Sequence, residues 1–337
     1  MKIAVVGLGF MGLTHLKAYK RIPGVEITAV SSNDPKVLAG DLSGVQGNFS
    51  LEGEAVDFSS AEKFADALEC VRNCQADAVD LCLPTNMHAA ASVAAMQAGK
   101  HVLVEKPMAL SGAECDQMIE CARATGRVLM SAQVLRFFPA YLPLIEAVHS
   151  GTLGAPRHAL FRRRCAAPTW GAWLTNKSLS GGGVFDLLIH DIDMALVCFG
   201  VPQSVSAYGH EDLSGGIDLM TAQLQYASGL NVTITGGWHL PSAYPFSMEY
   251  TAVGDQAAIE YSSAGRPPQW YARGESYPLP LAETDGYQAE IDYFVECCRS
   301  TLQPERCRPE SSAAAVKLAL LLNEARARQG EILPCQL

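Results

Sequence analysis

The feature that most constrains the fold is a glycine pattern at the start of the chain. An apolar run at residues 2–6 leads directly into Gly7, and Gly9 and Gly12 complete the pattern G-x-G-x-x-G before a helix-like stretch. The first glycine allows a tight turn, the second lets the backbone approach a pyrophosphate, and the third lets the helix pack close to the strand. The amino end of the helix attracts phosphate groups. This placement between strand and helix predicts a dinucleotide site at Gly7, Gly9, Phe10, Met11 and Gly12.

Strand and helix signals alternate over residues 1–133. Short apolar runs predict strands at 2–7, 25–30, 78–83, 101–105 and 128–133. Serine followed three residues later by glutamate predicts helix starts near 60 and 112, from Ser59–Glu62 and Ser111–Glu114, and glycines at 99 and 126 are typical of helix carboxyl ends. Such alternation indicates a parallel sheet with helices on both faces, so we expect a Rossmann dinucleotide-binding domain over residues 1–133.

The pattern changes after residue 134. Longer runs at 158–164, 204–208, 218–226, 230–235 and 247–253 predict strands, and two of them flank a Ser-Gly hairpin turn at 228–229. One strongly apolar helix is expected over 184–199, and amphipathic helices over 285–299 and 310–328. Residues 134–337 therefore predict an α+β domain with a mostly antiparallel, open sheet, which serves substrate binding and oligomerisation. Whether the helix near 310–328 packs back on the first domain is left open.

Composition excludes several classes of protein. The chain has 337 residues, 49% of them hydrophobic, and a net charge of −10, which argues against nucleic-acid binding. No apolar run is long enough to span a membrane, and no leader segment precedes the first strand, so a cytoplasmic protein is expected. The eleven cysteines lack zinc-like spacing, which favours reduced, buried thiols, and no metal site is expected.

Two further motifs narrow the interpretation. Glu105-Lys106-Pro107 follows a predicted core strand, at the edge where open α/β sheets bind ligands. Asp186 and His190 lie four residues apart on the helix that follows Gly181-Gly182-Gly183. Together with the glycine pattern, in this order and over essentially the full length, these motifs resemble the Gfo/Idh/MocA family, the glucose–fructose oxidoreductase and inositol dehydrogenase relatives.

The resemblance implies an activity and a set of roles. Members mostly oxidise a secondary alcohol of a sugar or cyclitol, or reduce the ketone, with NAD or NADP. It implies that Lys106 lies beside the nicotinamide, that the Lys106–Pro107 bond is often cis, and that Asp186 and His190 face the same substrate. The chemistry agrees, because hydride transfer from a carbinol needs a base, and an imidazole with a pKa of about 6.5 can serve in both directions. We expect His190 to be the general acid/base and Lys106 to stabilise the substrate oxygen.

The remaining candidates are single residues near the two motifs and the strand ends. Ser32 and Asn33 stand where an acidic residue marks NAD specificity, and with Lys36 nearby they favour NADP over NAD. His88 is either a ligand contact or a helix cap, and Gln133 and Arg136 contact the cofactor or form a polar pair at the domain junction. Arginines 162–164 either bind an anionic substrate or form ion pairs, and Asp191 and Asp193 are expected to be structural. The full candidate set adds Pro84, Thr85 and Glu105 for the cofactor, and Arg163 and Trp170 for the substrate.

Two alternatives to a simple dehydrogenase stay open. A dinucleotide-binding sensor on the same fold would not need the lysine, aspartate and histidine together. A redox-cycling epimerase or glycosidase with tightly held cofactor would use the same residues. The open sheet favours a homodimer or homotetramer, and the expected partner is a small polyhydroxylated substrate.

Overall fold

The computed structural model describes residues 1–47, 57–169 and 171–337, which form two compact units. The first unit contains residues 1–134 and 285–313, and the second contains residues 135–284 and 314–337. The domain limit predicted at 133/134 lies within one residue of the first division. Residues 285–313, which we predicted in the second domain, belong to the first unit instead.

A parallel sheet forms the centre of the first unit. Its strand order is β3-β2-β1-β4-β5-β6, the doubly wound arrangement expected from the sequence. Nearly all residues of β1, β4, β5 and β6 are buried, because helices cover both faces of a parallel sheet. The strands are β1 (Lys2–Val6), β2 (Glu26–Ser31), β3 (Glu62–Phe64), β4 (Ala78–Leu81), β5 (His101–Glu105) and β6 (Leu129–Ala132).

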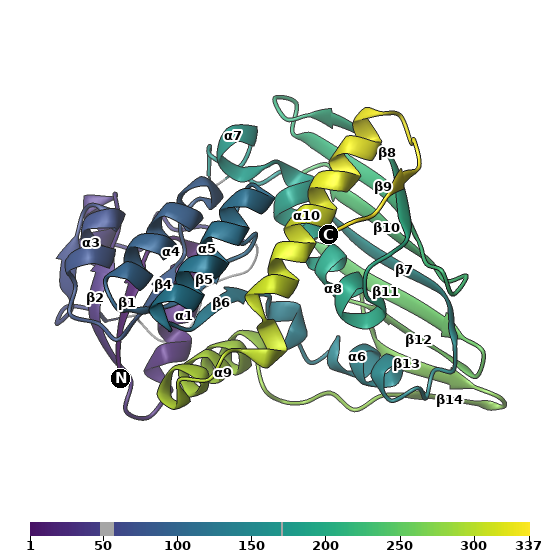
Figure 1. Ribbon diagram of the computed structural model, residues 1–337, viewed down its shortest axis with the longest axis horizontal. Coiled ribbons are helices and arrows are strands. Elements are labelled where there is room, and N and C mark those ends of the chain that lie inside the picture. Colours follow the sequence, from purple (N-terminus) through teal and green to yellow (C-terminus); the bar gives the residue numbers. More distant parts are fainter. Residues whose placement is uncertain (48–56, 170) are drawn as a thin grey trace. The chain divides into compact units, whose positions relative to one another are not determined.

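Helices connect these strands. Helices α3, α4 and α5 lie side by side over one face of the sheet, whereas α1 packs against α9 (Figure 1). Ser111 caps α5 as predicted, and Gly126 ends it in the left-handed conformation. The helical segments are α1 (Phe10–Lys20), α2 (Pro35–Leu38), α3 (Ala67–Asn73), α4 (His88–Gln97), α5 (Gly112–Thr125) and α9 (Gly286–Ser300), the 3₁₀ turns Thr85–Met87 and Glu305–Cys307, and the start of α10 (Pro309–Ala327).

The helix start predicted near residue 60 is wrong. Residues Glu62–Phe64 form the short strand β3, which pairs with β2 and buries Phe64. The amide of Ser59 donates to Asp57, so this serine lies in a turn and caps none of the described helices. The cap belongs to Asp66, whose carboxylate accepts from the Glu69 amide at 2.7 Å and begins α3. A capping pattern cannot identify its helix when a second acceptor follows within a few residues.

The second unit is built on a nine-stranded sheet of order β14-β13-β12-β11-β7-β10-β9-β8-β15. Strands β7 and β10 run parallel, and the other described pairs are antiparallel. The hairpin predicted at 228–229 joins β9 to β10, and all five predicted strands are present. The strands are β7 (Pro156–Cys165), β8 (Ser204–Asp212), β9 (Ile217–Gln225), β10 (Asn231–Trp238), β11 (Ser247–Gly254), β12 (Ala257–Ser262), β13 (Arg266–Ala272), β14 (Glu275–Pro278) and β15 (Leu333–Pro334).

Burial alternates along this sheet, because one face packs on helices. Along β9 the side chains of Met220, Ala222 and Leu224 are buried, and their neighbours are partly or fully exposed. On the more exposed face the hydroxyls of Thr221 and Thr235 form a 2.7 Å hydrogen bond. The helical segments of this unit are α6 (Leu142–His149), α7 (Lys177–Ser180), the π-helical turn Val184–Leu188, α8 (Ile189–Phe199) and the remainder of α10; the 3₁₀ turn Val134–Arg136 spans the division between the units.

Among the described residues, no helix combines the length and the apolar character needed to cross a membrane.

Candidate functional site

The predicted cofactor residues of the first unit share one edge of its sheet. Gly7 follows β1, Ser32 follows β2 by one residue, Lys106 follows β5 and Gln133 follows β6, each at the carboxyl end of its strand. Pro84 and Thr85 lie three and four residues past the end of β4. Because the strands are parallel, these ends meet at one edge, and the order reverses between β1 and β4. Open α/β sheets bind ligands at this reversal.

The three glycines of the pattern G-x-G-x-x-G are required for different reasons. Gly7 has a φ of +99°, and a Cβ there would lie 2.3 Å from the carbonyl oxygen of Cys82. A Cβ at Gly12 would lie 1.9 Å from the carbonyl oxygen of Gly7. A Cβ at Gly9, in contrast, would meet no described atom within 4 Å. Packing inside the chain therefore explains Gly7 and Gly12, and the open space above Gly9 fits a ligand that approaches the backbone.

The amino end of α1 is suited to an anion. Gly9 precedes the helix without a side-chain cap, and the first turn contains no acidic residue. The following residues Phe10 and Met11 are partly exposed. An uncapped helix amino end offers N–H groups and the positive end of its dipole to a phosphate.

Gln133 gives a second indication of a bound group. Its side chain is 1% exposed, yet neither its Oε1 nor its Nε2 has a hydrogen-bond partner among the described residues. A buried amide without partners costs free energy, which a ligand carrying a donor and an acceptor would recover. The residues at this edge therefore fit a dinucleotide such as NAD or NADP.

The end of β2 bears on cofactor choice. Ser32 is buried, and its Oγ accepts from the Asp34 amide at 3.1 Å. The Asp34 carboxylate accepts from the Lys36 amide at 2.8 Å and caps α2. Asn33 and Lys36 are exposed. The nearest acidic side chain after β2 is thus engaged as a helix cap.

His88 has a structural arrangement. Its ring is fully buried, and its two nitrogens lie 2.8 Å from the carbonyl oxygens of Pro107 and Leu83. Burial lowers the pKa of His88, and so does the charge of Lys106. Hydrogen bonds to the backbone of Leu83, Pro107 and Met108 oppose this lowering of the pKa. The structure therefore favours a link between the start of α4 and the Lys106–Pro107 turn over the predicted contact with cofactor.

Lys106 is half-buried at the end of β5, and its peptide bond to Pro107 is cis, as the family resemblance implied. The preceding Glu105 accepts the Lys106 amide at 2.9 Å through its own Oε2. Burial raises the pKa of Glu105, although the charges of His15 and Lys106 oppose this.

Sequence reasoning missed the buried charged residues behind this edge. They are His15 on α1, Asp80 in β4 and Glu290 on α9. The one signal available was Asp80, because an acidic residue inside an otherwise apolar, buried strand needs a buried partner.

In the second unit, Asp186 and His190 differ from their neighbours in exposure. Over residues 184–195 all side chains are buried except these two, which are partly exposed. Asp186 lies in the π-helical turn and His190 in the first turn of α8. The helix thus presents one carboxylate and one imidazole to the outside of its unit. Convergence of this pair with Lys106 involves both units and stays a prediction.

The three glycines before this helix are required by packing. Gly182 has a φ of +90°, and a Cβ there would lie 2.7 Å from Asp218 Oδ2. The same Asp218 oxygen accepts the Val184 amide at 3.1 Å. A Cβ at Gly183 would lie 2.7 Å from the Trp238 ring. The triple glycine therefore lets the helix start close to the sheet.

Two buried ion pairs fix α8. Asp191 accepts two hydrogen bonds from Arg163, at 2.8 and 3.0 Å, and Asp193 accepts two from Arg136, at 2.9 and 2.5 Å. Arg163 also donates to the hydroxyl of Tyr141 at 3.2 Å. These contacts agree with structural roles for both aspartates. They favour such roles for Arg163 and Arg136 over the predicted contacts with substrate and cofactor.

The other substrate candidate, Trp170, lies outside the described residues.

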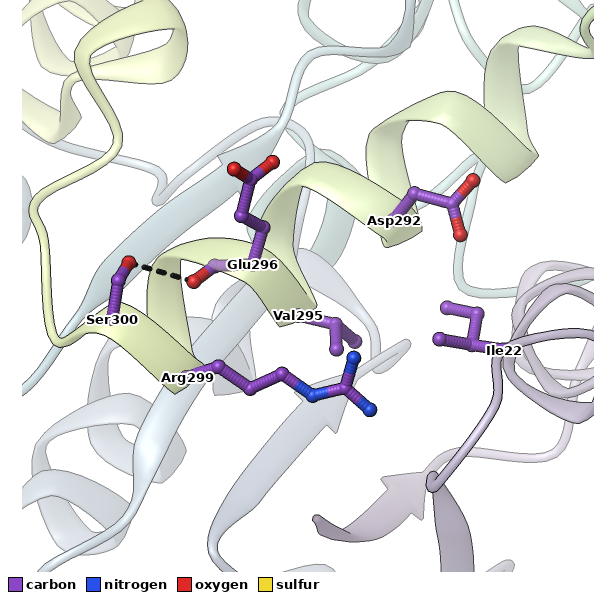
Figure 2. A pocket seen from close by; sticks show the side chains of 6 residues that line it. All are labelled: Ile22, Asp292, Val295, Glu296, Arg299 and Ser300. Carbon is purple, nitrogen blue, oxygen red and sulfur yellow. Dashed lines mark hydrogen bonds between the residues drawn. The ribbon is translucent and has the colours of Figure 1, made fainter.

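A surface hollow of about 400 Å³ lies elsewhere on the first unit. Figure 2 shows its lining residues: Ile22, Asp292, Val295, Glu296, Arg299 and Ser300. Arg299 donates to the carbonyl of Pro23 at 2.6 Å, in the loop that precedes β2. This hollow is therefore at the amino edge of the sheet, opposite the candidate cofactor residues.

Comparisons with known proteins agree with this geometry. Residues 1–133 match the family described as "Oxidoreductase family, NAD-binding Rossmann fold", and residues 141–260 match the "GFO/IDH/MocA C-terminal domain". The chain is 28% identical over 339 residues to myo-inositol 2-dehydrogenase of Thermotoga maritima, covering 96% of this chain and 95% of the relative. It is 26% identical over 344 residues to scyllo-inositol 2-dehydrogenase (NADP⁺) of Bacillus subtilis, covering 99% and 98%.

A solved structure shows the same fold. Aldose-aldose oxidoreductase from Caulobacter crescentus superposes with a TM-score of 0.84 at 22% identity, covering 99% of each chain. The order of motifs, the strand order of the first sheet and both matched domains lead to one assignment: the chain belongs to the Gfo/Idh/MocA family of NAD-binding oxidoreductases.

Proposed function

We propose that this oxidoreductase transfers a hydride between NAD(P) and a secondary alcohol or ketone of a sugar- or cyclitol-like substrate. The observation that carries the proposal is the exposure pattern of residues 184–195, where Asp186 and His190 are partly exposed and the other side chains are buried. A carboxylate and an imidazole that are accessible among buried neighbours are suited to bind a substrate. The inositol dehydrogenases among the relatives support a cyclitol as the first substrate to test.

The proposed roles follow from the chemistry of alcohol oxidation. NAD(P)⁺, when bound at the carboxyl edge of the first sheet, supplies the hydride acceptor. His190 removes the hydroxyl proton as the carbonyl forms, and returns it in the reverse direction. Lys106 donates a hydrogen bond to the same oxygen and stabilises its developing negative charge. Asp186 binds a neighbouring hydroxyl and orients the substrate.

We infer a preference for NADP. An NAD site presents a carboxylate to the ribose hydroxyls, whereas Asp34 is engaged as the cap of α2. The exposed Lys36 and Asn33 supply a cation and an amide donor for a 2′-phosphate. Fluorescence titration with NADPH and NADH measures this directly, and tighter binding of NADH would refute it.

The central experiment combines a substrate panel with three variants. Oxidation of myo-inositol, scyllo-inositol, D-glucose and a methyl glucoside is followed by the absorbance of NAD(P)H. We expect Lys106→Met and His190→Asn each to lower kcat by about 10²-fold or more, with little change in the Kd of NADPH for His190→Asn. His158→Asn is the matched control, because His158 is an exposed histidine of the same unit on β7. Full turnover by His190→Asn would contradict the assignment of the base.

A cytoplasmic homodimer or homotetramer is part of the same proposal. The more exposed face of the nine-stranded sheet, with its Thr221–Thr235 pair, is the surface we infer to pack on a second copy. The molar mass from light scattering, compared with 36.1 kDa for one chain, tests this.

A further inference from the structure

A buried group of charged side chains lies directly behind the candidate cofactor edge, within the first unit. His15 Nδ1 is 2.9 Å from Asp80 Oδ2, and His15 Nε2 is 3.4 Å from Glu105 Oε1. All three side chains are at most 9% exposed. They come from three different elements, α1, β4 and β5. Such a group is expensive to bury unless its charges compensate one another.

The imidazole of His15 faces carboxylates on both sides. Nδ1 is hydrogen-bonded to Asp80, whereas Nε2 makes an ion-pair contact with Glu105 and has no hydrogen-bond partner among the described residues. The imidazolium form carries an N–H on both nitrogens and places a positive charge between the two carboxylates. Burial lowers the pKa of His15, but the charges of Asp80, Glu105 and Glu290 outweigh burial and raise it to about 9. The ring is therefore a cation at neutral pH, between the two strand residues.

The other groups around His15 leave that assignment intact. The Cys82 thiol donates to Asp80 Oδ1 at 3.4 Å, and burial raises its pKa, so it remains a thiol. Burial also raises the pKa of Tyr19, with the charge of Asp80 contributing. Glu290 belongs to α9, which packs against α1. The one cation among these groups that touches both Asp80 and Glu105 is His15.

A short chain of contacts runs from His15 to the catalytic lysine. His15 contacts Glu105 through Oε1, and the other oxygen of this carboxylate accepts the Lys106 amide at 2.9 Å. His15 is also on the helix that begins at the glycine loop. One side chain thus connects the phosphate-binding helix with the backbone that carries Lys106.

We propose that His15 is a positioning residue, whose cationic imidazole holds the Glu105 carboxylate and, through it, the strand end that presents Lys106. The proposal rests on the proposed function, because it gives Lys106 its importance. Removing the positive charge of His15 frees Glu105 to rotate, and the Lys106 backbone loses its acceptor. Turnover then falls without loss of cofactor affinity.

A cation site is the alternative that the same side chains suggest. Ligand atoms of His15, Asp80 and Cys82 lie within 4.8 Å of one another. Each of the three is already hydrogen-bonded within the group, which favours a metal-free network. One equivalent of zinc in the purified full-length protein, measured by atomic emission, would overturn the proposal.

The first test needs no substrate. Protein labelled with ¹⁵N-lysine is titrated from pH 6 to 10.5 with and without NADPH, and Lys106→Arg assigns the Lys106 amide signal. We expect that amide to shift with an inflection near pH 9, and the inflection to vanish in His15→Asn and in Glu105→Gln. Asparagine keeps a donor toward Asp80, and glutamine keeps an acceptor for the Lys106 amide. An unchanged inflection in either variant would refute the connection.

The second test uses turnover of the panel member that is oxidised fastest. We expect His15→Asn to lower kcat at least tenfold while KM and the Kd of NADPH change less than threefold. Because His15 acts through Glu105, kcat of the double variant His15→Asn/Glu105→Gln should match kcat of Glu105→Gln within twofold. If the two residues acted independently, the two decreases in kcat would multiply. His101→Asn is the control. His101 is buried at the opposite end of β5, and its ring accepts the Val128 amide at 2.9 Å.

The outcomes separate the two proposals. If Lys106→Met abolishes turnover and His15→Asn matches His101→Asn, only the positioning role fails. If Lys106→Met keeps full turnover, the proposed role of the lysine fails, and the amide titration still decides whether His15 and Glu105 are coupled.

Discussion

At the scale of single residues, the glycines of the pattern G-x-G-x-x-G have different roles, two in folding and one in ligand binding. Gly7 and Gly12 are fixed by backbone atoms of the chain itself, whereas the space beside Gly9 is open. The sequence pattern alone does not distinguish the roles of the three glycines. The atoms around each Cα show which glycines are needed for packing within the chain and which one leaves space for a ligand.

Substitution of Gly9 by alanine should therefore leave the fold intact and weaken cofactor binding. Gly9 has a φ of −75°, which alanine tolerates, and no described atom lies where its methyl would go. The methyl would instead occupy the approach of the pyrophosphate, so we expect the Kd of NADPH to rise tenfold or more with an unchanged Tm. Gly44→Ala, at another open glycine with no positive φ, should change neither quantity. A Kd equal to wild type would place the phosphates elsewhere.

Sequence patterns are most informative where residues a few positions apart determine the structure, and least informative where distant partners determine it. The glycine turn, the Glu105-Lys106-Pro107 strand end and the Ser111 cap are set by neighbours within a few residues. Arg163 pairs with Asp191, and the ring of His88 lies against the carbonyl oxygens of Leu83 and Pro107, contacts that no pattern in the sequence predicts. The predicted ligand contacts of both residues stay predictions. The cluster around His15 was missed for the same reason, since it joins residues 65 and more positions apart.

At the scale of elements, α8 is held by arginines that reach it from other segments. Arg163 lies on β7, and its guanidinium is 3% exposed beside the fully buried Asp191. The same strand carries Arg157, which pairs with Asp255 at the surface and is 56% exposed. One strand thus offers a buried and an exposed pair of identical chemistry.

The two arginines should respond very differently to replacement by methionine. Arg163→Met leaves the Asp191 carboxylate buried without its cation, so we expect the free energy of unfolding to fall by about 3–5 kcal/mol. Arg157→Met leaves Asp255 in water, so we expect little change. Urea unfolding followed by circular dichroism compares the two, and equal losses would show that burial does not control these pairs.

At the scale of the whole molecule, the first unit is assembled from two separate stretches of chain. Helix α9 buries Ile291, Phe294 and Val295, and α1 is its neighbour. A family match that ends at residue 133 does not include this helix. From the sequence we assigned α9 to the same domain as the segments before and after it. An amphipathic pattern shows that a helix packs against something, but it does not show which part of the protein the helix packs against.

A fragment of residues 1–134 should consequently be less stable than the unit. Without α9, the apolar side of α1 meets water, and we expect a lower urea midpoint and a broader transition. Adding residues 285–313 through a glycine–serine linker of about 20 residues, long enough to act as a flexible coil, should restore both. Equal midpoints for the two fragments would mean that α9 contributes nothing to this fold.

The return of residues 285–313 to the first unit also constrains how such a protein can change over evolutionary time. The chain passes from one unit to the other at 134, at 284 and at 313, so neither unit corresponds to one uninterrupted stretch of coding sequence. Recombination that exchanged only the leading segment would separate α1 from the helix that covers it. We therefore expect new substrate specificities in such proteins to arise by substitutions within the full chain, and seldom by recombination that exchanges one unit.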